Sequence, residues 1–341
     1  MLYPMKIDLA RDRVLQIEMD QAAFRSASFL DDRMLTPATR GSWIPLQELL
    51  RSAATQAGAC PLHFIFHTGH VGSTLVSRLL DETGRVLSLR EPLPLRTLAA
   101  AQDALRDGTT PPLTQAQLDA LVTMCLRLWR RGFVTTEAVV VKATSGCARL
   151  APSLLGAAPA ARAIYLNLRA EAWLATLLAG ENSPVDLRGH APERLRRLSM
   201  HLQSPLPPLE ALSLGELAAL GWLTETSTQI ELLAGWTDRV LAIDFDVFLS
   251  DVAGQLQQIL AHFNLPRDAA FLAQVTRSPV LTRYSKAPEH PYDPGLRAAV
   301  LHDSRRRHRE EIAKGMRMLE ALVRNEPRLG ALFSLGRRPH P

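Results

Sequence analysis

A short glycine turn between an apolar strand and a helix constrains the fold of this chain more than any other feature. Residues 62–67 form an apolar run, residues 68–74 hold two glycines, and residues 75–80 have the apolar spacing of a helix. Glycines let the backbone turn tightly and bring its N–H groups toward an anion, and a helix N-terminus adds partial positive charge. The segment therefore predicts an anion site formed by Gly69, His70, Val71, Gly72, Ser73 and Thr74.

This turn differs from the Walker A motif of ATPases and kinases. Only two residues separate Gly69 from Gly72, where the motif has four, and Ser73 stands where the motif has its lysine. The difference disfavours an ordinary ATPase or kinase. A plain strand-to-helix turn that binds nothing remains an open alternative.

Short apolar strands alternate with helical segments along the rest of the chain. We expect further strands near residues 86–89, 137–142, 163–168 and 240–245. This alternation predicts an α/β fold with a doubly wound, mainly parallel sheet.

The domain organisation follows from the same pattern. We expect a leader segment over residues 1–60 with one helix at 46–57, one α/β domain over 61–325, and a tail over 326–341. Helical insertions are expected near 95–132 and 181–235. The second insertion begins with a proline-marked loop, followed by a long helix from about residue 214.

Composition excludes several classes of protein. The three cysteines, Cys60, Cys125 and Cys147, lie far apart without metal-ligand spacing, so we expect reduced thiols and no metal. No uncharged apolar run reaches the ~20 residues of a membrane span, which favours a soluble, cytoplasmic protein without a membrane partner. The net charge of +5 suits an anionic ligand. The basic run at 305–309 is interpreted as a solvated helix face, so no nucleic-acid partner is expected.

Residues 64–80 resemble the phosphosulfate-binding loop of the sulfotransferase superfamily, in its bacterial sulfotransferase-like branch. Gly72, Ser73 and Thr74 match the core of that loop, whereas His70 stands in place of the family's Lys or Arg and Gly69 in place of its Pro. The resemblance covers roughly residues 60–320. It implies 3′-phosphoadenylyl sulfate as the co-substrate, used without a metal.

Three further segments carry the resemblance. Arg169, at the end of a strand, and Thr176, in the next helix, resemble the family's element for the 3′-phosphate. Arg283 and Lys286 lie where the family places a basic loop over that phosphate. Lys142 resembles the lysine at the end of a family strand, which implies a contact with the ligand.

Glu91 is the candidate general base, because it resembles the catalytic glutamate of the tyrosylprotein and glycan branches of the family. A base that works near neutral pH needs a pKa raised by burial, and we expect this of Glu91. The alternative is a plain ion pair with Arg90. His70 and Lys142 complete the candidate catalytic set, His70 as a donor to the sulfate or a second base.

The resemblance thus implies a sulfotransferase that acts on a hydroxyl or amine of a small-molecule or peptide acceptor. Neither the acceptor nor the oligomeric state can be read from the sequence. Acceptor pockets of such folds come from the helical insertions, whose Leu-, Ala- and Pro-rich composition suggests an apolar wall. Two alternatives stay open: a P-loop nucleotide kinase or phosphotransferase, and a non-catalytic nucleotide-binding protein of the same fold.

Overall fold

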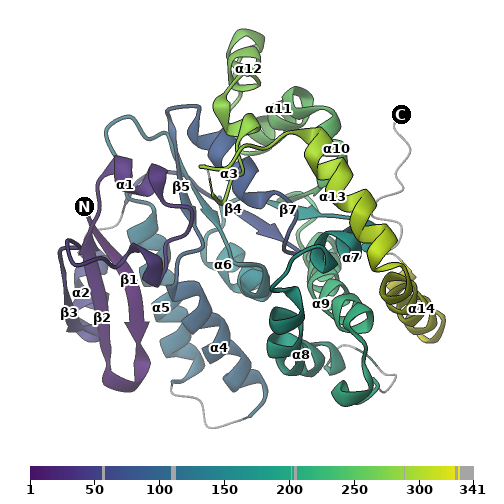
Figure 1. Cartoon of the computed structure of the whole chain (residues 1–341). Helices are drawn as coiled ribbons and strands as arrows, with labels where there is room; N and C mark the ends of the chain where they lie inside the picture. The colour runs from purple at the N-terminus through teal and green to yellow at the C-terminus, as the bar shows by residue number, and fades with distance from the viewer. Residues whose placement is uncertain are drawn as a thin grey trace.

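Five parallel strands form the central sheet in the computed structural model of the chain (Figure 1). The structure describes residues 1–55, 58–108, 113–200, 202, 206–287, 289–326 and 329–330. The strand order is β5-β6-β4-β7-β8. The bounds are Leu62–His67 for β4, Val86–Arg90 for β5, Ala138–Lys142 for β6, Ala163–Asn167 for β7 and Val240–Asp244 for β8.

This order confirms the predicted α/β fold with a doubly wound parallel sheet. From the central strand β4 the chain moves to β5 at one edge, returns through β6, and then crosses to β7 and β8 on the other side. All carboxyl ends of the strands therefore meet at one edge of the sheet, where open α/β folds bind their ligands.

The strands are buried on both faces, which explains their continuous apolar sequences. In β6, Val139 and Val141 belong to one hydrophobic core and Val140 to the other. The first core packs against α1 (Gln21–Ser26), α2 (Leu46–Thr55), α4 (Pro94–Arg106), α5 (Gln115–Trp129), a 3₁₀ segment η3 (Ser145–Leu150) and α6 (Ala151–Ala157).

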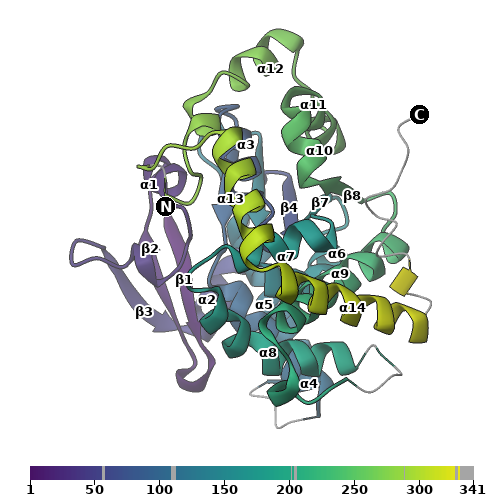
Figure 2. The same cartoon turned by 45° about the vertical axis from the view of Figure 1, so that its right-hand side comes forward.

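The second core packs against the remaining helices (Figure 2). They are α3 (Ser73–Asp81), α7 (Ala170–Leu178), α8 (Ser183–Ser199), α9 (Leu214–Gly235), α10 (Phe245–Ser250), α11 (Val252–His262), α12 (Ala269–Val275), α13 (Pro294–Arg307) and α14 (Arg309–Asn325). Most of the predicted tail at 326–341 lies outside the described residues.

Residues 1–60 hold more structure than the leader segment with one helix that the sequence predicted. The strands β1 (Leu2–Asp8), β2 (Arg13–Glu18) and β3 (Gly41–Pro45) form an antiparallel sheet. Figures 1 and 2 both show β1 beside α5, and Met5 belongs to the same core as the central strands. The predicted helix is α2.

The prediction of a proline-marked loop at the start of the second insertion is wrong, because most of that stretch forms α8. Pro184 lies in the first turn, where a missing N–H costs nothing, and only Pro192 lies inside the helix. Leu187, Ala191 and Leu198 share one buried face. This apolar spacing outweighs the proline signal. The long helix predicted from about residue 214 is confirmed as α9.

Candidate functional site

The glycine turn between β4 and α3 has a strongly constrained backbone. Gly69, His70 and Gly72 have φ values of 85°, 55° and 65°. Residues other than glycine rarely adopt this region of positive φ. A Cβ atom on Gly72 would lie 2.0 Å from the ring of Phe245. Both the conformation and the lack of space therefore require glycine at position 72.

Two side chains hold the turn in place. The Gly69 N–H donates to Nδ1 of His67 at 3.0 Å, and Nε2 of His67 lies 2.8 Å from the Ala143 carbonyl oxygen. Nε2 must therefore carry the proton. Burial, followed by the charge of Lys142, lowers the pKa of His67 well below 6.5, so the ring is neutral. Trp173 Nε1 donates to the Gly69 carbonyl at 2.7 Å.

The turn opens into a cavity of about 570 Å³, here called the loop cavity. Its lining brings together most of the predicted site residues: His70, Val71, Gly72, Ser73, Thr74, Glu91, Lys142, Thr176, Arg283 and Lys286. The Thr74 hydroxyl is buried and has no hydrogen-bond partner among the described residues. Buried polar atoms are nearly always paired, so this one points to a ligand.

A basic loop, residues 283–286, lines the loop cavity together with the N-terminus of α3. Arg78, on α3, donates from Nε to the Ser285 carbonyl at 2.8 Å and so ties the loop to the helix. Arg283 pairs with Pro291 in an isolated β-bridge that folds the loop back on itself. Arg283 and Lys286 are both exposed on it. Both residues thus line the same cavity as the glycine turn, and their contact with a 3′-phosphate stays a prediction.

Arg297, on α13, also lines the loop cavity and was missed by the sequence analysis. It pairs with Asp246 at 2.8 Å, and its guanidinium lies 5.4 Å from the centroid of the Phe245 ring. No motif surrounds it. The only feature of the sequence that indicated a role for Arg297 in the site is its position one turn into the helix that follows the basic loop.

Arg169 and Gly69 do not belong to the lining of the loop cavity. The backbone N–H and C=O of Gly69 are hydrogen-bonded to His67 and Trp173. Arg169 is exposed at the N-cap of α7. A contact between Arg169 and a 3′-phosphate stays a prediction. Thr176 does line the cavity, and its hydroxyl donates to the Ala172 carbonyl at 2.8 Å.

Glu91 and Lys142 form a buried ion pair at the edge of the loop cavity. Glu91 directly follows β5, which is separated from β4 by β6. The Glu91 carboxylate is joined to the site by its ion pair with Lys142, the last residue of β6. Glu91 has a φ of 55° and its N–H donates to the Lys142 carbonyl at 2.7 Å. Its carboxylate accepts hydrogen bonds from Lys142 Nζ and, at 3.3 Å, from the Thr144 hydroxyl.

The prediction of a raised pKa for Glu91 is wrong. Burial acts to raise the pKa, but the charge of Lys142 and its hydrogen bond outweigh burial and lower the pKa to about 2. The pKa of Lys142 is itself lowered by burial, against the opposing effect of Glu91. In the resting site Glu91 is an ionised, ion-paired carboxylate.

The alternative of an ion pair between Glu91 and Arg90 is also wrong. Arg90 points away from Glu91, pairs with Asp81, and donates to the carbonyls of Phe24 at 3.1 Å and Ala27 at 2.8 Å. It links β5 to α1 and α3 and so supports the fold.

His70 lies exposed at the mouth of the loop cavity. Desolvation by the surrounding protein, followed by the charges of Lys286 and Arg194, lowers its pKa to about 4. Since the ring is exposed, the direction of this shift is what matters. His70 is neutral near pH 7 and can donate or accept a hydrogen bond there, but it carries no charge.

In the part of the chain that the structure describes, no group of three or more His, Cys, Asp or Glu side chains is placed to hold a metal ion. The described helices include none that is long and apolar enough to cross a membrane. All three cysteines are free thiols.

No protein-family model matches this sequence, and no curated protein matches it significantly. The solved structures similar to it include a mouse sulfotransferase, SULT7A1, complexed with PAP, at 11% identity and a TM-score of 0.41 over 85% of this chain and 95% of that one. Sulfotransferase STF1 of Mycobacterium tuberculosis is 14% identical, with a TM-score of 0.42 over 78% and 81%. STF9 of Mycobacterium avium is 13% identical, with a TM-score of 0.40 over 85% and 91%. At these values the likeness adds nothing to the geometry of the site.

Proposed function

We propose that this protein is a sulfotransferase that transfers a sulfuryl group from 3′-phosphoadenylyl sulfate to a hydroxyl or amine acceptor. One observation carries the proposal. The buried, unpaired hydroxyl of Thr74 lies in a glycine turn at the head of a cavity that also holds Lys142, Lys286 and the carboxylate of Glu91. These are the parts that an in-line transfer of an anionic group needs.

The residues of the loop cavity fit such a donor. The helix N-terminus and the Thr74 hydroxyl offer hydrogen-bond donors to an anion, and Arg283 and Lys286 add positive charge to the same lining. Tyr284, which is 49% exposed, offers a ring face to a purine. A volume of about 570 Å³ lies within the usual range for a small-molecule site. When bound, the donor supplies the activated sulfuryl group.

Glu91 and Lys142 have separate roles in the proposed transfer. Glu91 accepts the proton of the acceptor's hydroxyl or amine as the new S–O or S–N bond forms. Lys142 stabilises the negative charge that develops on the 5′-phosphate as the old S–O bond breaks. Thr144 orients the carboxylate through its 3.3 Å hydrogen bond.

The low pKa of Glu91 belongs to the resting site. A donor anion beside Lys142 competes with Glu91 for the ammonium group and weakens the interaction that lowers the carboxylate's pKa. Burial, which acts in the opposite direction, then raises that pKa toward the range of a general base. On this view the donor itself activates Glu91.

Calorimetric titration with adenosine 3′,5′-bisphosphate tests the donor site, with magnesium-ATP titrated in parallel. We expect micromolar binding of the bisphosphate and weaker binding of ATP. Thr74→Val and Lys286→Ala should each weaken the bisphosphate about tenfold or more, the typical effect of one hydrogen bond to a charged group. Lys314→Ala is the matched control, because Lys314 pairs with Glu311 on α14, away from the cavity.

Arg169→Ala tests the role that the resemblance implies for the 3′-phosphate. Transfer of labelled sulfate, measured with Glu91→Gln, then separates an enzyme from a pure binder. We expect the variant to keep the bisphosphate and lose turnover. Failure to bind the bisphosphate, or a preference for magnesium-ATP, would overturn the proposal in favour of a kinase-like function.

A further inference from the structure

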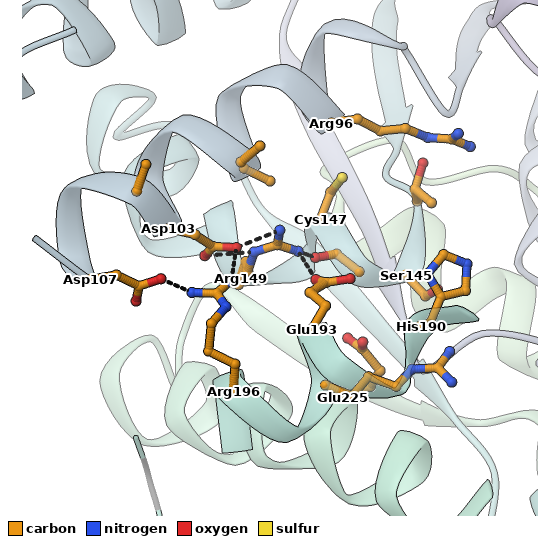
Figure 3. A pocket seen from close by; sticks show the side chains of 16 residues that line it. Arg96, Asp103, Asp107, Ser145, Cys147, Arg149, His190, Glu193, Arg196 and Glu225 are labelled. Carbon is orange, nitrogen blue, oxygen red and sulfur yellow. Dashed lines mark hydrogen bonds and ion pairs between the residues drawn. The ribbon is translucent and has the colours of Figure 1, made fainter. Parts of the chain in front are cut away.

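A second cavity of about 570 Å³ is lined by residues of α4, η3, α8 and α9 (Figure 3). It is here called the arginine cavity. Its charged lining consists of Arg96 and Asp103 on α4, Asp107 just after α4, Arg149 on η3, Glu193, Arg194 and Arg196 on α8, and Glu225 on α9. Ala99, Ala100 and Ala104 of α4 add an apolar part to this lining.

The arginine cavity reaches the reacting groups of the proposed transfer. Thr144 belongs to its lining and donates to the Glu91 carboxylate, which lines the loop cavity. Ser145, also in the lining, lies against the glycine turn: a Cβ on Gly69 would be 3.4 Å from its hydroxyl oxygen. Glu91 itself lines only the loop cavity, but it contacts two residues of the arginine cavity's lining, Thr144 at 3.3 Å and Arg96 at 3.9 Å.

Most of the carboxylates in the arginine cavity are already neutralised. Asp103 is bound by Arg149 at 2.8 Å and by Arg196 at 3.0 Å, and Arg196 also pairs with Asp107. Arg149 extends the network to Glu193 at 3.3 Å. Figure 3 shows these contacts as one connected group on one side of the cavity.

The fourth carboxylate is neutralised from outside the cavity. Glu225 accepts two hydrogen bonds from the buried guanidinium of Arg197, at 2.9 and 3.3 Å. All four carboxylates are therefore bound to arginines. A cationic ligand would have to break one of these ion pairs to find a partner.

Arg194 is different: carboxylates act on its charge electrostatically, but one of its donors has no hydrogen-bond partner among the described residues. Its Nη1 atom is buried and makes no hydrogen bond with any described residue. The guanidinium lies over Gly221 of α9, where an added Cβ would be 3.1 Å from Nη1. Burial lowers the pKa of Arg194 although Glu225 and Glu193 act in the opposite direction. An unpaired buried donor of this kind is costly unless a ligand satisfies it.

Arg96 is the second available cation. Its closest carboxylate is Glu91, at 3.9 Å, and that group is bound to Lys142. The side chain is 50% exposed, and Figure 3 shows it apart from the ion-pair network of Asp103, Arg149 and Arg196.

We propose that the arginine cavity binds the acceptor, and that the acceptor is a small molecule with a carboxylate or another anionic group, held by Arg194 and Arg96 while its hydroxyl faces Glu91. This inference rests on the proposed sulfotransferase function. It adds the class of acceptor and the two residues that select it. The planar fork of a guanidinium fits a planar anion such as a carboxylate in two-point contact.

Matched phenols test the inference: 4-hydroxyphenylacetate and its neutral isostere 4-hydroxyphenylacetamide. Binding of each is measured by calorimetry, with and without adenosine 3′,5′-bisphosphate. We expect the carboxylate to bind at least about tenfold more tightly than the amide. Arg194→Gln should remove most of that preference. Arg96→Gln provides a second, solvent-exposed position should the first variant fold poorly. Arg188→Gln, an exposed residue of α8 outside the cavity lining, is the control and should leave the preference intact.

The outcomes separate the two proposals. Equal binding of both phenols, no binding of the carboxylate up to about 10 mM, or a preference that survives in both Arg194→Gln and Arg96→Gln overturns the acceptor inference. Failure of the protein to bind the bisphosphate overturns the donor proposal instead. The titration without nucleotide still measures whether Arg194 selects an anion.

Discussion

Removing the ammonium group of Lys142 should destabilise the protein in a way that depends on pH with a defined sign. The side chains of Lys142 and Glu91 are 1% and 10% exposed, so water cannot replace the lost partner. Lys142→Met keeps the volume of the aliphatic chain and leaves the Glu91 carboxylate buried without its counter-charge. Any loss of stability therefore reports on the ion pair more than on packing.

The pKa of Glu91 sets the magnitude. Its fall from 4.5 to about 2 corresponds to about 3 kcal/mol of stabilisation, since one pKa unit equals about 1.4 kcal/mol. Breaking a buried pair by removing one partner typically costs about 3–5 kcal/mol. We therefore expect Lys142→Met to lower the free energy of unfolding by about 3 kcal/mol or more at pH 7.

The pH dependence follows from linkage. In the wild type the folded-state pKa of Glu91 lies below its unfolded value, so this stabilisation is complete above pH 4.5 and is lost as the pH falls toward 2. In Lys142→Met, burial alone raises the pKa above 4.5. The variant is then most stable at acid pH and loses stability as the pH rises. The difference between the two proteins should narrow from pH 7 to pH 4.

Urea denaturation followed by circular dichroism at pH 4, 5.5 and 7 measures these free energies. The double variant Glu91→Gln/Lys142→Met removes both charges and should recover most of the loss, because the partners act as one unit. The reasoning is refuted if the single variant is as stable as the wild type at pH 7, or if its deficit is the same at every pH.

Two further predictions concern the glycine turn. Gly72→Ala combines a φ of 65° with a clash against Phe245, so we expect a loss of about 2–5 kcal/mol in unfolding free energy. The control Gly84→Ala has a φ of 72° but no atom within 4 Å of the added Cβ, and should cost only about 1–2 kcal/mol. Equal losses in the two variants would contradict the role given to Phe245. The pKa of His70 is lowered to about 4, so its ring should stay neutral between pH 5.5 and 8. We therefore expect calorimetry to give the same pH dependence of bisphosphate binding for the wild type and His70→Gln. A change in affinity near pH 6.5 in the wild type alone would show that His70 becomes charged there.

The central sheet was predictable because its strands are buried on both faces. A parallel strand covered on two sides must be apolar at every position, so β6 and β7 stand out as short continuous runs between helical periods. The glycine turn was predictable for a related reason: two glycines with positive φ between a strand and a helix leave a clear pattern in the sequence. These signals are local, and the structure confirms them.

The missed elements depend on contacts between distant segments. β3 carries mostly exposed side chains, and nothing in its own sequence distinguishes it from a loop until it pairs with β2. The ionisation of Glu91 was misjudged for the same reason. Burial could be foreseen from the residues around it, but the contact with Lys142, 51 positions later, could not. In the folded protein that contact decides the sign of the pKa shift.

The arginine cavity shows what the composition of the insertions could not indicate. In α4, Leu95 and Leu98 face the core, and apolar residues dominate any average over the segment. Arg96 and Asp103 line the cavity, together with Ala99, Ala100 and Ala104 of the same helix. A helix that separates a packing face from a charged face looks apolar when all its residues are averaged. Only the packing of α4 against the neighbouring elements shows which few of its side chains line the arginine cavity. Those side chains determine the chemistry of the ligand that can bind there.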